Sequence, residues 1–439
     1  MTRDTIFALS TARGRAGIAV IRVSGGHAGV TLDILAGHRP APRRATLTAL
    51  RDPKTAELLD RALVLWFPTP NSVTGEDMAE FHLHGSPAVI AGVLAALGGL
   101  EGCRMAEPGE FTRRAYEDGR LDLSAAEGIA DLVAAETAGQ RRQALAQSGG
   151  ALARVVEGWA LRLTRMLAHL EAAIDFPEED LPPDLASGLA RDRAALAAEI
   201  TVSLADRQRG ERLRDGLAVA LIGPPNSGKS SLLNTLAGRE AAIVAATAGT
   251  TRDIIEVHLD LGGYPVILAD TAGLRAATDE IEAEGIRRAR ARAEAADVTL
   301  LVLDATDPMQ KSTFAPLIDE RTLIVWNKLD LGPVTGAGAD DRLISAHTGE
   351  GVTALVAELQ RRADDLMAGP PSVVTRARHR TALEDCVEAL MRNATADLSA
   401  PELAAEDLRL ALRAIGRITG RVDVEDVLDI VFREFCIGK

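Results

Sequence analysis

The sequence predicts a multidomain protein that combines α/β and all-α architecture, and three observations lead to this fold class. The chain has 439 residues, which is more than one hydrophobic core usually serves. Helical periodicity dominates two stretches, on either side of a segment in which predicted strands and helices alternate. That middle segment contains Gly223-Pro-Pro-Asn-Ser-Gly-Lys-Ser230, which fits the phosphate-binding pattern G-x-x-x-x-G-K-[ST].

Composition and charge narrow the function classes. The chain is 47% hydrophobic and 26% charged, as in ordinary globular proteins, and its formal net charge is −14. So acidic a chain does not bind nucleic acid by overall charge, and any RNA contact must use local basic patches or a partner protein. Cys103, Cys386 and Cys436 form no disulfide framework or zinc pattern, which favours a reducing cytoplasm. We expect no signal peptide and no membrane span.

Residues 1–118 are expected to form a small α/β domain. Gly17–Ser24 and Ala62–Phe67 are short apolar runs that end in glycine or proline, so they are predicted strands. A loop is predicted for Thr69–Ser86, within which His82 and His84 alternate as on a half-buried strand with polar side chains facing out, and a helix follows over Pro87–Leu97.

Residues 119–214 are predicted to be helical. One apolar face repeats at steps of three and four through Leu152–Ile174, and a second helical segment runs from Asp184 to Arg214. Helical patterning returns in residues 371–439, with predicted helices over Thr381–Ala394, Pro401–Gly416 and Val422–Phe435. We expect the two helical parts to form one domain with residues 215–370 inserted, because insertion joins chain ends that lie close together. A separate C-terminal helical domain is the alternative.

The inserted segment opens with a strand, a loop and a helix. Leu217–Ile222 is a predicted buried strand, and Ser231–Ala237 a predicted helix. Glycines in the loop between them let successive N–H groups face a phosphate at the start of the helix. Lys229 would then place its charge on the terminal phosphates, and the Ser230 hydroxyl could bind Mg²⁺.

Two further loops follow in the order that a nucleotide site requires. Gly249-Thr-Thr-Arg-Asp253 precedes a predicted edge strand over residues 254–261, and its threonines can reach Mg²⁺ and the terminal phosphate. The strand Pro265–Ala269 ends in Asp270-Thr-Ala-Gly273. A carboxylate at this strand end is expected near Mg²⁺, and the Gly273 N–H can contact the γ-phosphate and be released after hydrolysis.

The base-recognition motif is Asn327-Lys-Leu-Asp330, at the end of a predicted strand. Asp330 can accept from the ring N–H and the amino group of guanine, whereas adenine would leave the carboxylate unpaired. Ser345-Ala-His347 fits the loop whose backbone N–H contacts the guanine oxygen. Together these motifs predict GTP binding. The expected nucleotide contacts are Asn226, Ser227, Gly228, Lys229, Ser230, Ser231, Thr250, Thr251, Asp270, Thr271, Ala272, Gly273, Asn327, Lys328, Asp330, Ser345 and Ala346.

Catalysis needs a separate explanation. Leu274 stands where small signalling GTPases carry the glutamine that orients water. Arg275 could act as an arginine finger, and Glu282 could orient water from the second switch loop. Asn226 suggests a monovalent cation held beside the phosphates. Lys229, Asp270 and Glu282 are the expected catalytic residues.

The motifs GPPNSGKSSLLN, GTTRD, DTAGLR and NKLD, set within helical flanks, resemble those of the tRNA-modification GTPase MnmE (TrmE) family. The resemblance covers the whole chain, including the segments TGED and EFTRRAYEDGRLDL and the ending Phe435-Cys-Ile-Gly-Lys439. It implies a folate-binding-like N-terminal domain, a discontinuous helical bundle and an inserted Ras-like P-loop GTPase domain. The flanks and the ending distinguish it from ribosome-assembly GTPase switches of the Era/Der kind, which are the alternative.

The resemblance also implies an activity. It implies a cytoplasmic homodimer joined through the N-terminal domains, which hydrolyses GTP when K⁺ promotes pairing of the GTPase domains. With a flavoprotein partner (GidA, also called MnmG), it would add an aminomethyl-type or carboxymethylaminomethyl-type group to C5 of the wobble uridine in tRNA. The one-carbon donor would be 5-formyltetrahydrofolate or a related tetrahydrofolate derivative.

Residue by residue, the resemblance implies the following sites. Mg²⁺ would bind Ser230 and Thr251. K⁺ would bind Asn226, Ala245, Thr247 and Thr250, although Ala245-Ala-Thr replaces the family's common Thr-Asp-Ile. The folate site would comprise Arg22, Glu80, Arg120 and Lys439, with Arg120 in place of the more usual lysine. Cys436 could be a nucleophilic thiol, and a buried, inert thiol is the alternative, because its neighbours Phe435 and Ile437 are apolar.

Overall fold

The computed structural model of the protein describes residues 3–175, 185–239, 241–243, 256–270, 290–369, 372–392, 401–422, 428, 431–433 and 435–438. The chain divides into two compact units. One unit contains Met1–Ala130, Ser148–Ala168 and Leu408–Lys439, and the other contains Asp131–Gln147 and His169–Asp407. None of the helices in the described ranges is long and apolar enough to cross a membrane.

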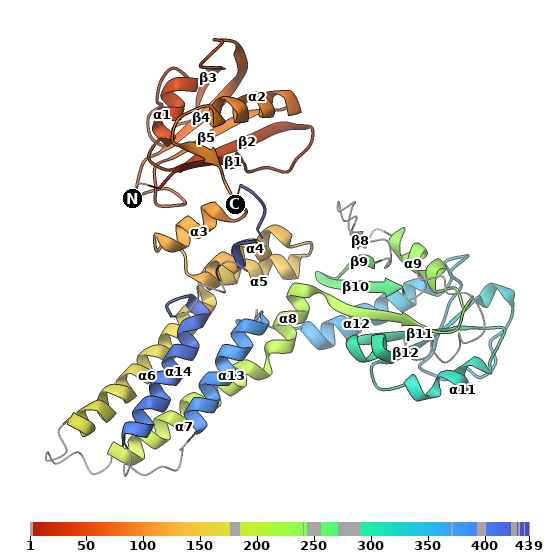
Figure 1. The fold of residues 1–439 in the computed structure, drawn as a ribbon. Coiled ribbons are helices and arrows are strands. Elements are labelled where there is room, and N and C mark those ends of the chain that lie inside the picture. Colours follow the sequence, from red (N-terminus) through yellow and green to blue (C-terminus); the bar gives the residue numbers. More distant parts are fainter. Residues whose placement is uncertain are drawn as a thin grey trace. The chain divides into compact units, whose positions relative to one another are not determined.

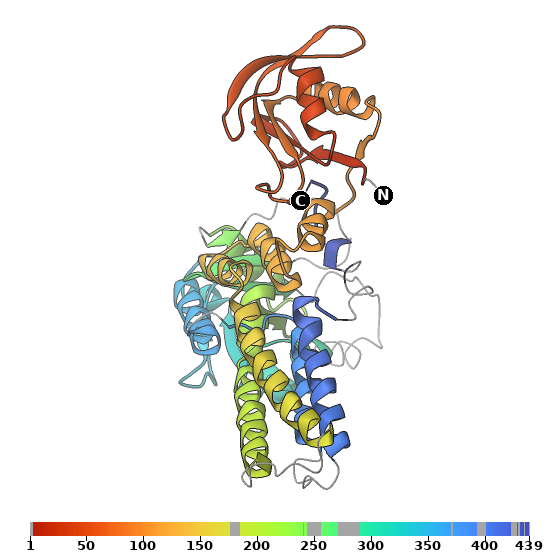
Figure 2. The same ribbon diagram turned by 90° about the vertical axis from the view of Figure 1, so that its left-hand side faces the viewer.

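The N-terminal α/β part contains a mixed sheet with the strand order β3-β4-β5-β2-β1-β6 (Figures 1 and 2). Its strands are β1 (Thr5–Leu9), β2 (Ala16–Ser24), β3 (Thr46–Arg51), β4 (Leu58–Phe67), β5 (Met78–Gly85) and β6 (Cys103–Met105). The helices α1 (Ala28–Leu35) and α2 (Pro87–Gly98) both pack against β5. They bury one face of the sheet, where Phe81 and Leu83 are almost inaccessible to solvent.

The predicted loop over residues 69–86 is wrong in its second half, because residues 78–85 form the strand β5 between β2 and β4. The alternation that defines the strand is visible in the sequence. Phe81 and Leu83 point into the core, whereas Glu80, His82 and His84 are more exposed on the other face. The alternation of His82 and His84 indicated a half-buried strand, but its start at Met78 was not predicted.

The helical elements flank the inserted α/β part on both sides in sequence. They are α3 (Glu110–Glu117), α4 (Leu123–Ala134), α5 (Ala138–Ser148), α6 (Ala151–Asp175), α7 (Leu185–Ala205), α8 (Arg207–Asp215), α13 (Ala377–Met391) and α14 (Pro401–Thr419). Helices α7 and α13, which precede and follow the insertion, pack along one another. This pairing fits the expectation of one discontinuous helical domain. The domain boundaries themselves stay a prediction.

One helix prediction is wrong, and another stays untested. The single helix expected over residues 184–214 is instead the two helices α7 and α8, which meet at Asp206. Most of the helix expected over residues 422–435 lies outside the described residues. Helix α6 agrees with the sequence, since Leu152, Trp159 and other members of its predicted apolar face are buried.

The inserted part is a doubly wound sheet with the order β13-β12-β11-β7-β10-β9-β8. Its strands are β7 (Leu217–Ile222), β8 (Ala242–Ile243), β9 (Glu256–Leu261), β10 (Tyr264–Asp270), β11 (Val298–Asp304), β12 (Thr322–Asn327) and β13 (Arg342–Leu343). Its helices are α9 (Lys229–Ala237), α11 (Gln310–Phe314) and α12 (Val352–Met367). The strand expected at the edge, β9, runs antiparallel between β10 and β8, so β8 occupies the edge instead.

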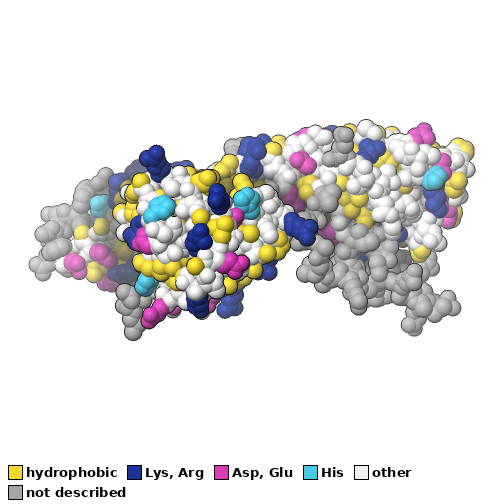
Figure 3. Space-filling model, turned by 90° about the horizontal axis from the view of Figure 1, so that it is seen from above, with side chains coloured by type: hydrophobic (Ala, Val, Ile, Leu, Met, Phe, Trp, Pro, Cys, Tyr) yellow, Lys and Arg dark blue, Asp and Glu magenta, His cyan; other side chains and the backbone are white. Residues whose placement is uncertain are grey.

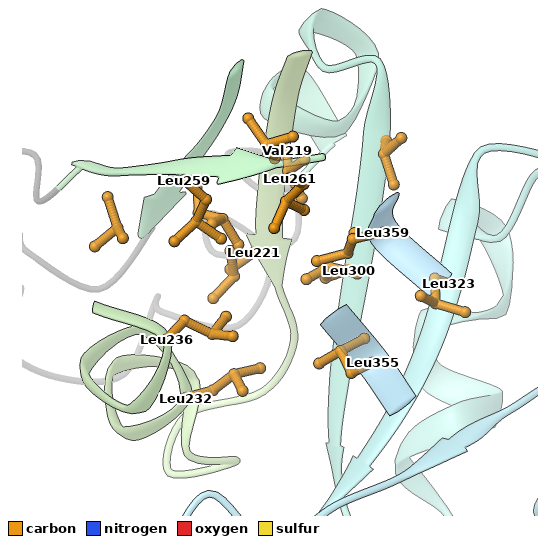
Figure 4. Close-up of a cluster of buried hydrophobic side chains, with 14 of the residues drawn as sticks. Val219, Leu221, Leu232, Leu236, Leu259, Leu261, Leu300, Leu323, Leu355 and Leu359 are labelled. Atoms are coloured by element: carbon orange, nitrogen blue, oxygen red, sulfur yellow. The ribbon is translucent and has the colours of Figure 1, made fainter. Parts of the chain in front are cut away.

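Apolar side chains fill the space between this sheet and its helices (Figure 4). Leu232 and Leu236 of α9 lie near Leu221 of β7, and Leu355 of α12 lies near Leu300 of β11, in one cluster on the same face of the sheet. Each such leucine contributes about 1.5–3 kcal/mol when it is fully buried. The core therefore fixes the strand ends, from which the nucleotide-site loops emerge.

Candidate functional site: the guanine-nucleotide loops and the N-terminal polar cluster

The phosphate loop connects β7 to α9 and has a backbone that only glycine adopts easily. Gly223 and Gly228 have φ angles of 139° and 90°. A Cβ atom at either position would lie 2.1 Å from a neighbouring atom, the Val302 carbonyl oxygen or Asn327 Nδ2 respectively. The two glycines are therefore required both for the turn and for close approach of the loop to adjacent strand ends.

Lys229 lies at the first position of α9 and is 7% exposed. Its ammonium donates hydrogen bonds to the carbonyl oxygens of Gly223 (3.0 Å) and Pro224 (2.7 Å) across the loop. The buried Ser227 hydroxyl has no hydrogen-bond partner. Thus the loop presents a cation and a buried polar group at a helix N-terminus, a combination that attracts phosphate.

Asn327 connects the phosphate loop to the loop after β13. It is 2% exposed and lies at the end of β12. Its Nδ2 donates to the Ser227 carbonyl oxygen (2.9 Å), while its Oδ1 accepts from the Ala346 N–H (2.9 Å). One side chain therefore holds the phosphate loop and the loop after β13 at fixed positions.

Asp330 follows in the 3₁₀ turn Leu329–Leu331. Its Oδ1 accepts a hydrogen bond of 2.5 Å from the Ser345 hydroxyl. This hydrogen bond, assisted by the charges of His347 and Lys328, lowers the pKa of Asp330 below its ordinary value. The carboxylate is consequently ionised at neutral pH and ready to accept from two N–H donors.

Asp304 and Thr235 also support these loops, and the sequence reasoning missed both. Asp304 Oδ2 accepts a 2.6 Å hydrogen bond from Lys328, and Thr235 Oγ1 donates to the Ala346 carbonyl oxygen at 2.8 Å. Burial raises the pKa of Asp304, but hydrogen bonds from Lys328 and Thr306 outweigh it and the net shift is downward. One signal could have revealed Asp304: it directly follows the predicted strand over residues 298–303, and the next predicted strand leads into the base-recognition motif.

Other predicted residues are less informative. Asn226 has a positive φ of 61° and is exposed, as are Ser230 and Ser231. The backbone of Asp270 ends β10 as expected, but its side chain lies outside the described part of the chain. The remaining predicted residues of the switch loops and the K⁺ site also lie outside it: Ala245, Thr247, Thr250, Thr251, Thr271, Ala272, Gly273 and Glu282.

Arg22 and Glu80, two of the predicted folate-site residues, form an ion pair. They are opposite one another in register on β2 and β5. Arg22 Nε and Nη2 both donate to Glu80 Oε1, at 3.1 and 3.0 Å, and the guanidinium lies over the Phe111 ring. Arg120 instead lies beside Gly75, and Lys439 is outside the described residues.

The TGED segment forms a polar cluster with neighbouring elements that sequence reasoning did not resolve. The Ser24 hydroxyl contacts Thr74 Oγ1 and Glu76 Oε2, both at 2.7 Å. Glu76 accepts from Arg114 of α3 at 3.0 Å, and Arg114 also pairs with Glu110 at 3.0 Å. This network ties the turn after β4 to α3.

The C-terminal tail lies against the N-terminal domain. Ser10 Oγ donates to the Gly438 carbonyl oxygen at 2.9 Å, and Ile437 forms an isolated β-bridge with Pro108. Cys436 is exposed, so the alternative of a buried thiol is wrong. The neighbouring Phe435 is buried and anchors the tail by packing on Phe432.

Comparison with known proteins places the chain in a family. A sequence profile for the N-terminus of the GTP-binding protein TrmE matches residues 5–120, and a profile for the MnmE helical domain matches residues 123–436. The chain belongs to the MnmE (TrmE) family of GTPases. It is therefore an enzyme that hydrolyses GTP, with an N-terminal α/β domain, a discontinuous helical domain and an inserted P-loop GTPase domain.

Individual relatives match over their full length. The tRNA modification GTPase MnmE of Rhodospirillum rubrum is 57% identical over 457 residues, covering 100% of both chains. The protein of the same name from Parvibaculum lavamentivorans is 57% identical over 441 residues, covering 99% of this chain and 100% of its own. Among solved structures, Aquifex aeolicus Era bound to GDP and aluminium fluoride aligns over 40% of this chain and 66% of its own, with 25% identity and a TM-score of 0.27.

Proposed function

We propose that this GTPase acts in the modification of tRNA, adding an aminomethyl-type or carboxymethylaminomethyl-type group to C5 of the wobble uridine. The observation that carries the nucleotide part is the Asn327 bridge, which holds the phosphate loop and the base loop to one side chain, three residues before Asp330. Support for the RNA part comes from full-length relatives named for tRNA modification. The alternative, a ribosome-assembly switch of the Era/Der kind, has no such full-length support.

The phosphate loop fits a magnesium nucleotide. Its glycines allow the left-handed turn and the close approach to neighbouring strand ends, and Lys229 and the buried Ser227 hydroxyl supply polar groups there. Ser230 and Thr251 would hold Mg²⁺, with Asp270 beside it, through the hard oxygen ligands that this ion prefers. When bound, Mg²⁺ neutralises charge on the phosphate oxygens.

Water activation would depend on Glu282 and on K⁺. The exposed Asn226, with its left-handed backbone, would direct an amide oxygen toward K⁺, and the other ligands would come from Ala245, Thr247 and Thr250. Such a cation would replace the charge of an arginine finger, which is worth about 10³–10⁵ in rate in other GTPases. Pairing of two GTPase domains would complete the site.

The test is GTP turnover in K⁺ and in Na⁺ at equal ionic strength, for the wild type and for Asn226→Ala. We expect at least a tenfold acceleration by K⁺ in the wild type and its loss in the variant, because one cation ligand is removed. Asn234→Ala, an exposed asparagine on α9, is the matched control and should keep the acceleration. Equal, slow rates of the wild type in both salts would contradict the K⁺ proposal.

We further propose that the N-terminal domain binds 5-formyltetrahydrofolate or a related derivative as the one-carbon donor. Arg22, Glu80, Arg120 and Lys439 would form its site. The half-buried Arg22–Glu80 pair fits this ligand, since it offers both a cation for a carboxylate and an acceptor for ring N–H groups. The folate would supply the carbon that is transferred to the uridine.

The partners proposed are a second copy of this chain, the flavoprotein GidA (MnmG) and tRNA. Leu47 and Leu63 form an exposed cross-strand pair on the open face of the N-terminal sheet, and Ile18 on β2 is 65% exposed, so this face is a suitable dimer surface. Sedimentation of the isolated protein should show a dimer. Figure 3 shows basic and acidic side chains intermixed on the visible face, which agrees with tRNA contacts that are local or shared with the flavoprotein.

A further inference from the structure

Asp304 ends β11 at the same level as the base-recognition motif. It is opposite Asn327 in the parallel register of β11 and β12. The Ala305 N–H donates to the Asn327 carbonyl oxygen at 2.8 Å. Asp304 is therefore fixed one strand away from the residues that are proposed to bind guanine, although it belongs to none of the nucleotide-binding motifs.

Both carboxylate oxygens of Asp304 have partners. Oδ1 accepts from the Thr306 N–H (2.9 Å) and from the Thr306 hydroxyl (2.7 Å), while Oδ2 accepts from the Lys328 ammonium at 2.6 Å. The backbone N–H of Asp304 is held in turn by Gln310 Oε1 at 3.0 Å. With a side chain only 14% exposed, the carboxylate has a fixed orientation and is shielded from competing water.

Lys328 directly follows Asn327 and precedes Asp330 by two residues. It adopts a left-handed backbone with a φ of 71° and begins the 3₁₀ turn that carries Asp330. A lysine side chain is long and flexible, and fixing it costs conformational entropy of up to about 2 kcal/mol. Asp304 restricts the Lys328 side chain before any ligand arrives, because it holds the ammonium at the end of the four-carbon stem.

We infer that Asp304 is a positioning residue for guanine-nucleotide recognition, which acts by anchoring Lys328 so that its apolar stem forms a fixed wall at the base site. This inference rests on the proposed assignment of the base site to Asn327 and Asp330. Since the wall contacts the base end of the ligand, GDP and GTP depend on it equally. The hydrolytic step at the phosphate end does not.

The experiment measures the dissociation constants of GDP and GTP, together with kcat and KM, for Asp304→Ala, Lys328→Met and the double variant. We expect Asp304→Ala to weaken both nucleotides by the same factor of about five to ten, in line with loss of one charge-assisted hydrogen bond. At saturating GTP, kcat should stay within about twofold. Lys328→Met should cause a similar loss, and the double variant should lose no more than either single variant.

Two further variants make the result specific. Asp304→Asn keeps an acceptor oxygen and should give an intermediate loss, which also covers the case in which the alanine variant is unstable. Asp307→Asn changes an exposed carboxylate that pairs with Gln310 rather than Lys328, so nucleotide affinity should not change. Full additivity of the Asp304 and Lys328 losses, or a loss in kcat rather than in affinity, would overturn the inference.

Asp330→Asn separates this inference from the site assignment. That variant should prefer xanthosine over guanosine triphosphate, because an amide can donate to the xanthine oxygen. If it keeps its preference for guanine, the proposed base site itself is wrong. If the preference switches but Asp304→Ala binds GDP normally, the base site stands and only the positioning role fails.

Discussion

At the scale of single residues, the close approach of Gly228 to Asn327 sets the spacing of the nucleotide-site loops. The loop glycine lies so near the amide that a methyl group would overlap it. The same amide spans the phosphate loop and the base loop. Thus one glycine without a side chain and one buried asparagine together set the separation between the phosphate end and the base end of the site.

Gly228→Ala should therefore disrupt nucleotide binding. The new Cβ would lie 2.1 Å from Asn327 Nδ2 at a φ of 90°, and such strain costs on the order of 1–3 kcal/mol. We expect at least a tenfold rise in the dissociation constant of GDP, measured by calorimetry. Gly238→Ala is the control, because its φ is −80° and its nearest neighbours are 3.5 Å away or more. Equal affinity in the two variants would contradict this account.

At the scale of elements, polar contacts connect the GTPase sheet to the helices that flank it. The turn between β9 and β10 meets the start of α5, where the Gly139 N–H donates to the Gly263 carbonyl oxygen at 2.8 Å. Gln140 and Gln143 continue along α5 and bind carbonyl oxygens at the end and the middle of α8. Since β9 follows the GTTRD loop and β10 precedes the DTAG loop, this junction adjoins the strand pair that carries both switch loops.

A second contact between elements is pH-dependent. Glu358 of α12 accepts hydrogen bonds from Arg361 and Arg362 on its own helix and from Arg342 of β13. The hydrogen bond from Arg361 is the main cause of a pKa lowered from 4.5 to about 2. A lowered folded-state pKa stabilises the protein above the unfolded pKa, so this stabilisation is complete above about pH 4.5 and is lost as the pH falls toward 2.

Glu358→Gln should accordingly destabilise the GTPase domain at pH 7 by about 1 kcal/mol, since the arginines are partly exposed and the pairs are screened by solvent. The difference from the wild type should shrink as the pH is lowered to 3, when followed by urea unfolding. Glu388→Gln removes an exposed pair with Arg392 and should have little effect at either pH. A difference that is constant with pH would show that the charge of Glu358 does not matter.

At the scale of the whole molecule, the ends of the chain meet. The Gly438 carbonyl oxygen accepts a hydrogen bond from Ser10, 428 residues away in sequence. Three residues before Gly438, Phe435 packs against Phe432. Ser10 follows the strand β1, where Ala8 pairs with Arg22. The C-terminal tail is therefore next to the proposed folate site, which would otherwise consist of N-terminal residues alone.

Loss of residues 436–439 should lower the affinity for 5-formyltetrahydrofolate. Arg22→Met should lower it by about tenfold or more, because a charge-assisted contact is removed from a half-buried site. Calorimetry measures both effects. Arg51→Met, on an exposed arginine that binds only the nearby Ala56 carbonyl in the described structure, is the control. Unchanged binding in the Arg22 variant would refute the assignment of this site.

The sequence by itself determined much of the GTPase core. Apolar runs such as Leu217–Ile222 specify buried strands over their full length. The phosphate loop can be predicted from the sequence because its backbone requires glycine at fixed positions. Local rules suffice here, since each signal lies within a few consecutive residues. The same rules missed the start of β5 at Met78, although they registered the alternation of His82 and His84, and they missed the break at Asp206 within a long helical pattern.

Only the tertiary structure decided which distant residues cooperate. Nothing local in the sequence pairs Asp304 with Lys328, joins Asn327 to Ser227, or brings Gly438 to Ser10. These contacts arise because parallel strands end at one edge of a sheet and because the tail returns to the first strand. Their partners are far apart in the chain, so their energies depend on packing that the whole fold must first provide.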